Sequence, residues 1–178
     1  MFAKNISVMI SEKELADRVA ELGKQITEDY RNRSNKLLFV GILKGSVVFL
    51  SDLIRAVDLP LTIDFMIASS YGSQTTSDGV VTIRKDIAQD LTGYDIIIVE
   101  DILDSGFTLD KICNVLRGRN AESVRICTLL EKPARRKVHI DVDYCGFSIE
   151  DQFIVGYGLD YDQQYRNLPF IGVVEGID

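Results

Sequence analysis

The chain has 178 residues, of which 46% are hydrophobic and 26% charged, a composition typical of one globular domain with a full core. Its net charge of −7 argues against nonspecific nucleic-acid binding as the main activity, because that activity needs a basic surface. No apolar run approaches the ~20 residues that cross a bilayer, and the first residues lack the apolar stretch of a secretory signal.

The first third of the chain predicts a helix, a strand and a second helix. Ser11 and Glu14 have the spacing of a capping box, and apolar residues recur at helical spacing up to Tyr30, so an amphipathic helix is predicted over about residues 12–31. The apolar run LLFVGIL (37–43) has the length of a buried strand. Residues 47–57 predict a mostly buried helix that ends before Pro60.

The remainder alternates strands with loops and one further helix. Residues 61–68 and 80–87 predict strands, and the polar, unpatterned stretch 69–79 between them predicts a mobile loop. DIIIVED (95–101) is the clearest buried strand, and a helix opens directly after it within residues 104–120. Further strands are predicted at 123–132, 144–149, 153–157 and 170–174.

Apolar strands that alternate with helices predict a single α/β domain whose parallel sheet is covered on both faces. In such sheets a ligand binds beyond the carboxyl ends of the strands. Three predicted strand ends carry polar residues that therefore converge on one crevice: Lys44-Gly45, Glu100-Asp101 and Glu131-Lys132.

The sharpest signal is the segment VEDILDSGFTL (99–109), in which a buried strand delivers Glu100 and Asp101 to its end. The loop 104–108 then begins a helix, and the free N–H groups of a helix N-terminus bind phosphate. Carboxylates beside a phosphate would repel it unless they accept hydrogen bonds from sugar hydroxyls or face a magnesium ion held by the ligand. The segment therefore predicts a ribose 5-phosphate site.

The same segment resembles the phosphoribosyl-diphosphate signature of the type I phosphoribosyltransferases. LKGS (43–46), SSYG (69–72), LLEKP (129–133) and residues 151–169 resemble the hypoxanthine-guanine branch of that family, so that the resemblance covers residues 8–175. It implies one domain over residues 1–178, with a central parallel sheet flanked by helices and a small hood built from about residues 1–10 and 145–178. The implied reaction joins a 6-oxopurine to 5-phosphoribosyl 1-diphosphate in purine salvage, with Mg²⁺ as cofactor.

The resemblance also implies roles for individual residues. Asp104 handles the proton on the purine N7, and Glu100 and Asp101 contact the ribose hydroxyls and magnesium. The 5′-phosphate loop consists of Asp104, Ser105, Gly106, Phe107 and Thr108.

Pyrophosphate is expected to bind Lys44, Gly45 and Arg166, with the Leu43–Lys44 peptide in the cis form. Asp160 is the second metal-site carboxylate. The base is expected to contact Lys132, Phe153, Ile154 and the backbone near Asp160, and Ser70 and Tyr71 belong to a mobile lid. Lys132 has donors only, so that it suits the 6-oxo group of hypoxanthine or guanine rather than the 6-amino group of adenine.

Other features are given lesser roles. His139 is interpreted as a structural or surface residue, and Arg135-Arg136-Lys137 as a solvated or subunit-contact run from which one arginine could approach pyrophosphate in a neighbouring subunit. Cys113, Cys127 and Cys145 form no metal or disulfide pattern and fit a reducing cytoplasm. No membrane or nucleic-acid partner is expected.

Two alternatives stay open. One is a non-catalytic, nucleotide-sensing RNA-binding regulator of the same superfamily, and the other is a magnesium-dependent phosphoryl-transfer enzyme with Asp101 or Asp104 as nucleophile. The sequence leaves undecided the preference among hypoxanthine, guanine and xanthine, and the choice between a homodimer and a homotetramer.

Overall fold

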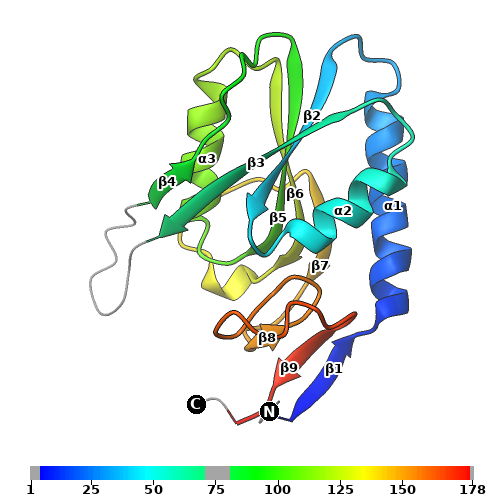
Figure 1. Cartoon of the computed structure of the whole chain (residues 1–178), viewed down its shortest axis with the longest axis vertical. Coiled ribbons are helices and arrows are strands. Elements are labelled where there is room, and N and C mark those ends of the chain that lie inside the picture. Colours follow the sequence, from blue (N-terminus) through cyan, green and yellow to red (C-terminus); the bar gives the residue numbers. More distant parts are fainter. Residues whose placement is uncertain (1–4, 71–80, 177–178) are drawn as a thin grey trace.

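The computed structural model describes residues 5–70 and 81–176, which form a six-stranded sheet, a three-stranded sheet and flanking helices (Figure 1). None of the helices in these ranges is both long and apolar enough to cross a bilayer. The elements are, in chain order, β1 (Ile6–Ile10), α1 (Glu12–Tyr30), β2 (Lys36–Leu43), α2 (Val47–Ala56), β3 (Thr62–Ser70), β4 (Val81–Lys85), β5 (Tyr94–Leu103), α3 (Phe107–Arg117), β6 (Ser123–Glu131), the 3₁₀ turn η1 (Pro133–Arg135), β7 (Tyr144–Ser148), β8 (Ile154–Val155) and β9 (Ile171–Val174).

The six-stranded sheet confirms the predicted α/β fold. Its strand order is β4-β3-β2-β5-β6-β7, and all neighbours pair in parallel except β4, which pairs antiparallel with β3 at one edge. β5 lies between β2 and β6 and is covered on both faces, which explains its nearly continuous apolar sequence.

Helices α1 and α2 cover one face of the sheet and α3 covers the other (Figure 1). Alternate residues of the central strands point to opposite faces. Phe39 and Ile97 therefore pack in the core beneath α1 and α2, whereas Leu38 and Ile96 pack in the core beneath α3. The two cores fix β5 from both sides and so determine where its carboxyl end lies.

The ends of two helices show how far local sequence predicts structure. The capping box of Ser11 and Glu14 is present at the start of α1, as predicted. Helix α3 begins later than the predicted segment 104–120, at Phe107, because Gly106 is its N-cap with a φ of 95°. No side chain caps α3, so the Asp104 carboxylate is left for other contacts.

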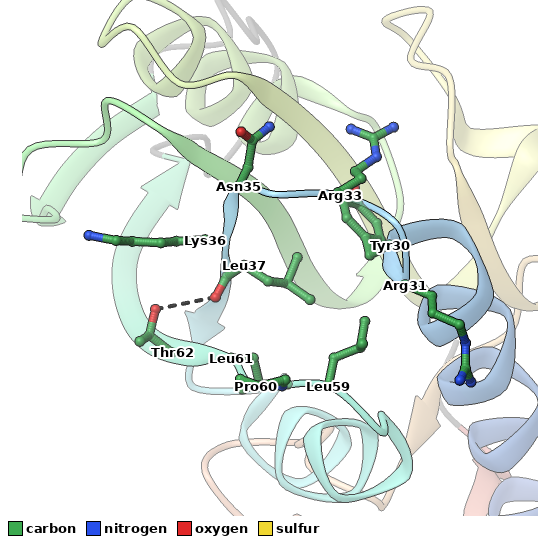
Figure 2. A pocket seen from close by; sticks show the side chains of 10 residues that line it. All are labelled: Tyr30, Arg31, Arg33, Asn35, Lys36, Leu37, Leu59, Pro60, Leu61 and Thr62. Atoms are coloured by element: carbon green, nitrogen blue, oxygen red, sulfur yellow. Dashed lines mark hydrogen bonds between the residues drawn. The ribbon is translucent and has the colours of Figure 1, made fainter.

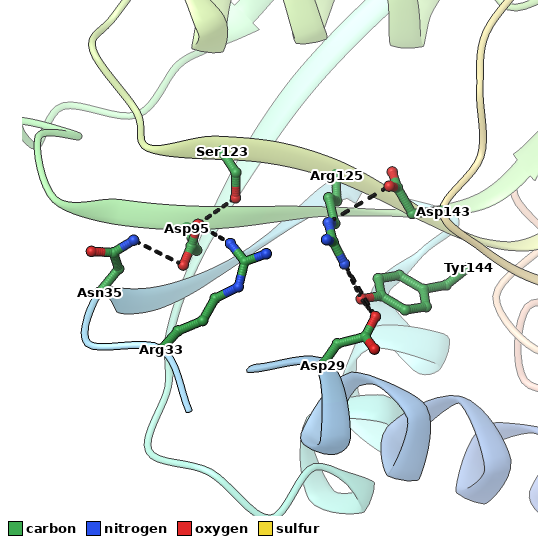
Figure 3. Close-up of polar contacts among 8 residues, drawn as sticks. All are labelled: Asp29, Arg33, Asn35, Asp95, Ser123, Arg125, Asp143 and Tyr144. Carbon is green, nitrogen blue, oxygen red and sulfur yellow. Dashed lines mark hydrogen bonds and ion pairs between the residues drawn. The ribbon is translucent and has the colours of Figure 1, made fainter. Parts of the chain in front are cut away.

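A polar cluster fixes the amino-terminal ends of β5 and β6, at the edge opposite the predicted site (Figure 3). The Asp95 carboxylate is 1% exposed and accepts hydrogen bonds from Arg33 at 3.1 Å, from Asn35 at 3.2 Å and from Ser123. A buried carboxylate is tolerated when it is paired and hydrogen-bonded in this way. The cluster ties the loop between α1 and β2 to the central strands.

The smaller sheet has the order β1-β9-β8, combines strands from both ends of the chain and lies beyond the carboxyl ends of the parallel strands (Figure 1). β8 has two residues instead of the five predicted over 153–157, because Gly156, Tyr157 and Gly158 have positive φ angles of 100°, 49° and 103° that end the strand. β7, which falls within the expected hood range except for Tyr144, pairs with β6 in the larger sheet. The single-domain organisation and the hood boundaries stay predictions.

Candidate active site

Two glycines make close approaches that no larger residue permits, Gly45 to the carboxyl end of β5 and Gly158 to Gly45. A Cβ atom on Gly45 would lie 1.5 Å from Oδ2 of Asp101, and one on Gly158 would lie 2.1 Å from the carbonyl oxygen of Gly45. The Leu43–Lys44 peptide is cis, as the resemblance implied. The structure therefore brings together the Lys44-Gly45 loop, the carboxylates of β5 and the segment after β8.

The side chains of Lys44 and Arg166 converge on one atom, although 121 intervening positions separate them in the sequence. Lys44 Nζ donates to Oε1 of Gln163 at 3.0 Å, and Arg166 Nη2 donates to the same oxygen at 3.3 Å. Arg166 Nη1 also donates to the carbonyl oxygen of Gly158 at 2.7 Å. Sequence reasoning missed Gln163, because an isolated amide side chain carries no pattern.

Asp160 shapes the same loop. Its Oδ1 lies 2.7 Å from Nη2 of Arg166, and its Oδ2 accepts from the backbone N–H of Gln163 at 2.8 Å. Both carboxylate oxygens therefore hold the loop that carries Arg166. Within residues 5–70 and 81–176, Asp160 is not brought together with Glu100 and Asp101 into a three-carboxylate group suited to a metal ion.

Glu100 and Asp101 are adjacent carboxyl groups at the end of a buried strand. Oε2 of Glu100 is shielded from solvent and has no hydrogen-bond partner among the described residues. Burial, and then the charge of Asp101, raises the pKa of Glu100 well above its usual value. Burial also raises the pKa of Asp101, against an opposing hydrogen bond from the Ile102 N–H at 2.9 Å. The pair is suited to a cation or to donor hydroxyl groups.

The predicted phosphate loop lines a cavity of about 150 Å³ together with Glu100. Gly106 adopts a φ of 95°, and a Cβ there would lie 3.1 Å from the carbonyl oxygen of Val138. The carbonyl oxygen of Ser105 accepts from the N–H groups of Lys137 at 2.9 Å and Val138 at 3.1 Å. The loop is thereby braced from behind, and its side chains at 104, 105 and 108 face the cavity.

The residues expected to read a base lie directly after β6 and at the start of β8. Lys132 is 9% exposed and donates to the carbonyl oxygen of Gln152 at 2.6 Å. Phe153 is 42% exposed and packs edge-to-face against Tyr161, with ring centroids 5.3 Å apart. Ile154, by contrast, is buried and offers only its backbone to a ligand. An exposed aromatic ring beside a buried lysine suits a flat, polar-edged ligand.

The basic run 135–137 is exposed at Arg135 and Lys137, as expected of a solvated segment, but two of its side chains also contact residues at the site. Arg135 Nε donates to Oδ1 of Asp104 at 2.8 Å, and Arg136 is partly buried with its guanidinium 3.4 Å from Glu131. The run turns back on the site through η1, and this long-range contact is invisible in local sequence. His139 is confirmed as a surface residue, since its side chain is 92% exposed beside Asp141.

Two other features lie apart from these contacts. The loop predicted over 69–79 begins later than expected, because β3 extends to Ser70; Tyr71 and the rest of that loop fall outside the described residues. A larger cavity of about 440 Å³ opens at the amino-terminal ends of β2 and β3, with Leu37, Leu59 and Leu61 among its lining residues (Figure 2). It shares no residue with the site at the strands' carboxyl ends.

Comparison with known proteins identifies the class. Residues 9–162 match the phosphoribosyl transferase domain family, and the chain belongs to that family. It is 50% identical over 173 residues to the hypoxanthine phosphoribosyltransferase of Salmonella typhimurium, covering 97% of both chains. It is 47% identical to the hypoxanthine-guanine phosphoribosyltransferase of Mycobacterium avium, covering 95% of this chain and 85% of the relative. A crystal structure of a Staphylococcus aureus hypoxanthine phosphoribosyltransferase superposes with a TM-score of 0.90 at 47% identity, covering 95% of this chain and 91% of that one.

Replacing Glu100 by glutamine is expected to raise the free energy of unfolding measured in EDTA. Because the pKa of Glu100 is raised in the folded protein, the native state retains a proton that the unfolded chain releases, and stability falls as pH rises between the unfolded and folded pKa values. The gain from glutamine should therefore be larger at about pH 8 than at about pH 5 in urea titrations. Glu28→Gln, on the exposed side of α1, is the control, and an equal gain at both pH values would contradict the assignment.

Proposed function

We propose that this protein transfers the 5-phosphoribosyl group from 5-phosphoribosyl 1-diphosphate to hypoxanthine or guanine, releasing IMP or GMP and pyrophosphate in purine salvage. The observation that carries the proposal is the pair of buried carboxyls at the end of β5, set between the cavity of the phosphate loop and the Lys44-Gly45 loop. The identity of 50% to hypoxanthine phosphoribosyltransferase over nearly the whole chain supports it.

The sugar phosphate is assigned to the end of β5 and the start of α3. Backbone N–H groups of the loop 104–108 and the hydroxyls of Ser105 and Thr108 bind the 5′-phosphate, because the N-terminus of the 11-residue α3 leaves N–H groups unpaired. Phe107 contributes its backbone. Glu100 and Asp101 accept hydrogen bonds from the ribose hydroxyls, which gives the unpartnered Oε2 of Glu100 a donor.

Pyrophosphate is assigned to Lys44, Gly45 and Arg166. Two cations that already share the Gln163 oxygen can move together onto a polyanion, and guanidinium binds phosphate oxygens in a bidentate manner. The close approach at Gly45 leaves the backbone of this loop open to the ligand and excludes a side chain.

Magnesium is the proposed cofactor, and the donor set fits it in part. Mg²⁺ is commonly bound through one or two carboxylates and completed by substrate oxygens, and Glu100 and Asp101 supply such a pair. Asp160, the proposed second metal carboxylate, would retain lone pairs for the ion beside its present contacts to Arg166 and the Gln163 N–H. When bound, the ion neutralises charge on the pyrophosphate.

The base is assigned to Lys132, Phe153, the backbone of Ile154 and the segment near Asp160. Lys132 donates to the 6-oxo group and leaves adenine with a mismatched donor. Stacking on the exposed ring of Phe153 contributes about 1–3 kcal/mol.

Asp104 is assigned the proton transfer. The purine N9 forms a bond to C1 of the ribose, the bond from C1 to pyrophosphate breaks with its electron pair on the leaving oxygen, and the N7 proton passes to the Asp104 carboxylate. The ribose is cation-like between these events. Because no side chain caps α3, Asp104 is available for this role.

We also infer an assembly of two or four copies in a reducing cytoplasm. Val8, Val47 and Ile63 are between 42% and 59% exposed and would be covered in an assembly, and the three cysteines are free thiols. Sedimentation equilibrium that gives a monomer at micromolar concentration would refute the assembly.

The direct test is to mix the protein with 5-phosphoribosyl 1-diphosphate, hypoxanthine and Mg²⁺ and to follow formation of IMP. IMP should form with hypoxanthine, GMP with guanine, and turnover should be lost in EDTA and restored by Mg²⁺. Adenine should give no product. Absence of both IMP and GMP would refute the proposal, and an RNA gel shift and a phosphatase assay in parallel would detect the two alternatives.

Asp104→Asn is expected to lower turnover on the order of 10²–10⁴-fold, because an amide cannot take the N7 proton. Binding of IMP, measured by calorimetry, should change far less. Asp110→Asn, in the first turn of α3, is the matched control and should retain turnover. Unchanged turnover in Asp104→Asn would remove this residue from the mechanism.

A further inference from the structure

We propose that Arg135 and Asp151 form a positioning pair, which holds Asp104 and Lys132 side by side so that both meet the same edge of the purine. The inference rests on the proposed function, which gives Asp104 the N7 proton and Lys132 the 6-oxo group. From the sequence, Arg135 was interpreted only as part of a solvated or subunit-contact run, and Asp151 was given no individual role.

Four charged side chains form a continuous chain with alternating sign. Asp104 Oδ1 accepts from Arg135 Nε at 2.8 Å, and Arg135 Nη1 donates to Oδ2 of Asp151 at 3.2 Å. The other oxygen of Asp151, Oδ1, lies 3.2 Å from Nζ of Lys132. Asp151 therefore uses one oxygen for each cation and links the two base-reading groups through Arg135.

The backbone holds this chain of charges in place. Lys132 follows β6, and its N–H donates to the carbonyl oxygen of Leu103 at 3.0 Å, which ties it to the end of β5 beside Asp104. Arg135 closes η1 by donating its N–H to the carbonyl oxygen of Lys132 at 3.1 Å. The two cations thus belong to one turn that is fixed to the strand carrying the proposed catalytic carboxylate.

The contacts leave the groups that a 6-oxopurine needs. No residue within the described ranges is hydrogen-bonded to Oδ2 of Asp104, so this oxygen can accept from N7–H. Lys132 uses two donors, to Asp151 and to the carbonyl oxygen of Gln152, and retains a third for O6. N7 and O6 are neighbours on one edge of the purine, and an acceptor and a donor held close together are complementary to that edge.

The alternation of charges also explains why two residues, rather than one, connect Asp104 to Lys132. A lysine and an aspartate at neighbouring positions would otherwise pair directly and occupy each other. Arg135 engages Asp104, and Asp151 engages Lys132, so neither base-reading group needs the other. Arginine suits this role because its planar fork reaches two carboxylates at once, whereas lysine presents a point charge.

A purely structural role for these contacts would be small. The side chains of Arg135, Asp104 and Asp151 are 52%, 43% and 45% exposed. Ion pairs with this exposure contribute little to folding, because solvent screens them and holding two long side chains costs entropy. A large effect of Arg135 on kinetics, without an effect on unfolding, therefore separates positioning from stability.

The first experiment compares Arg135→Gln, Arg135→Lys and wild type in the IMP-forming assay. Arg135→Gln should raise the KM for hypoxanthine by roughly tenfold to a hundredfold, because charged hydrogen bonds that orient both groups are lost. The KM for 5-phosphoribosyl 1-diphosphate and the midpoint of thermal unfolding should stay close to wild type. Arg135→Lys should restore part of the loss. The control is Arg119→Gln, which removes an arginine paired with Asp86 at the far end of α3 and should leave both KM values unchanged.

The second experiment is a double-mutant cycle with Asp151→Asn, which also serves if Arg135→Gln does not fold. Because the two residues act as one unit, the double variant should be hardly worse than the worse single variant. Additive effects, an unchanged KM for hypoxanthine in both single variants, or equal losses for both substrates would overturn the positioning pair. A wild-type protein that forms neither IMP nor GMP would instead overturn the proposed function itself.

Discussion

Two carboxyl groups lie next to each other at the buried end of β5, and the rest of the site is arranged around them. Glu100 has a buried oxygen with no hydrogen-bond partner among the described residues, and burial raises the pKa of both groups. Such an arrangement costs stability in the empty protein unless a ligand supplies donors or a cation. Surrounding loops place cations and N–H groups nearby without neutralising the two carboxyl groups directly. The carboxyl groups are therefore left to interact with a ligand that carries hydroxyls and phosphate.

Close backbone packing fixes the positions of the segments that surround these two carboxyl groups. Gly45 lies against Asp101, and Gly158 lies against Gly45, so that three segments distant in sequence are held within contact. Arg166 is fixed by the carbonyl oxygen of Gly158, by Gln163 and by Asp160. A site that is positioned before the ligand arrives loses less entropy on binding, which is the physical advantage of these contacts.

At the base-binding end of the site, ion pairs rather than close glycine contacts hold the groups in position. Asp104 follows β5 and Lys132 follows β6, and Arg135 and Asp151 connect the two side chains. The segment 135–137 was interpreted from sequence as solvated or subunit-contacting, because three successive basic residues in a polar stretch usually are. Its return to the site depends on η1 and on the hydrogen bonds that Ser105 accepts from Lys137 and Val138, both of which are tertiary features.

The sequence by itself determined the α/β class, the central strand DIIIVED, the capped helix α1 and, through one segment, the family. These are local or short-range properties, because apolar periodicity, cap spacing and the motif at residues 99–109 each depend on residues that are close together in the sequence. Only the tertiary structure decided that Gln163 joins Lys44 to Arg166, that Asp160 pairs with Arg166, and that β8 stops after two residues. Each of these depends on atoms brought together by chain folding across many residues, or on positive φ angles that side-chain pattern does not reveal.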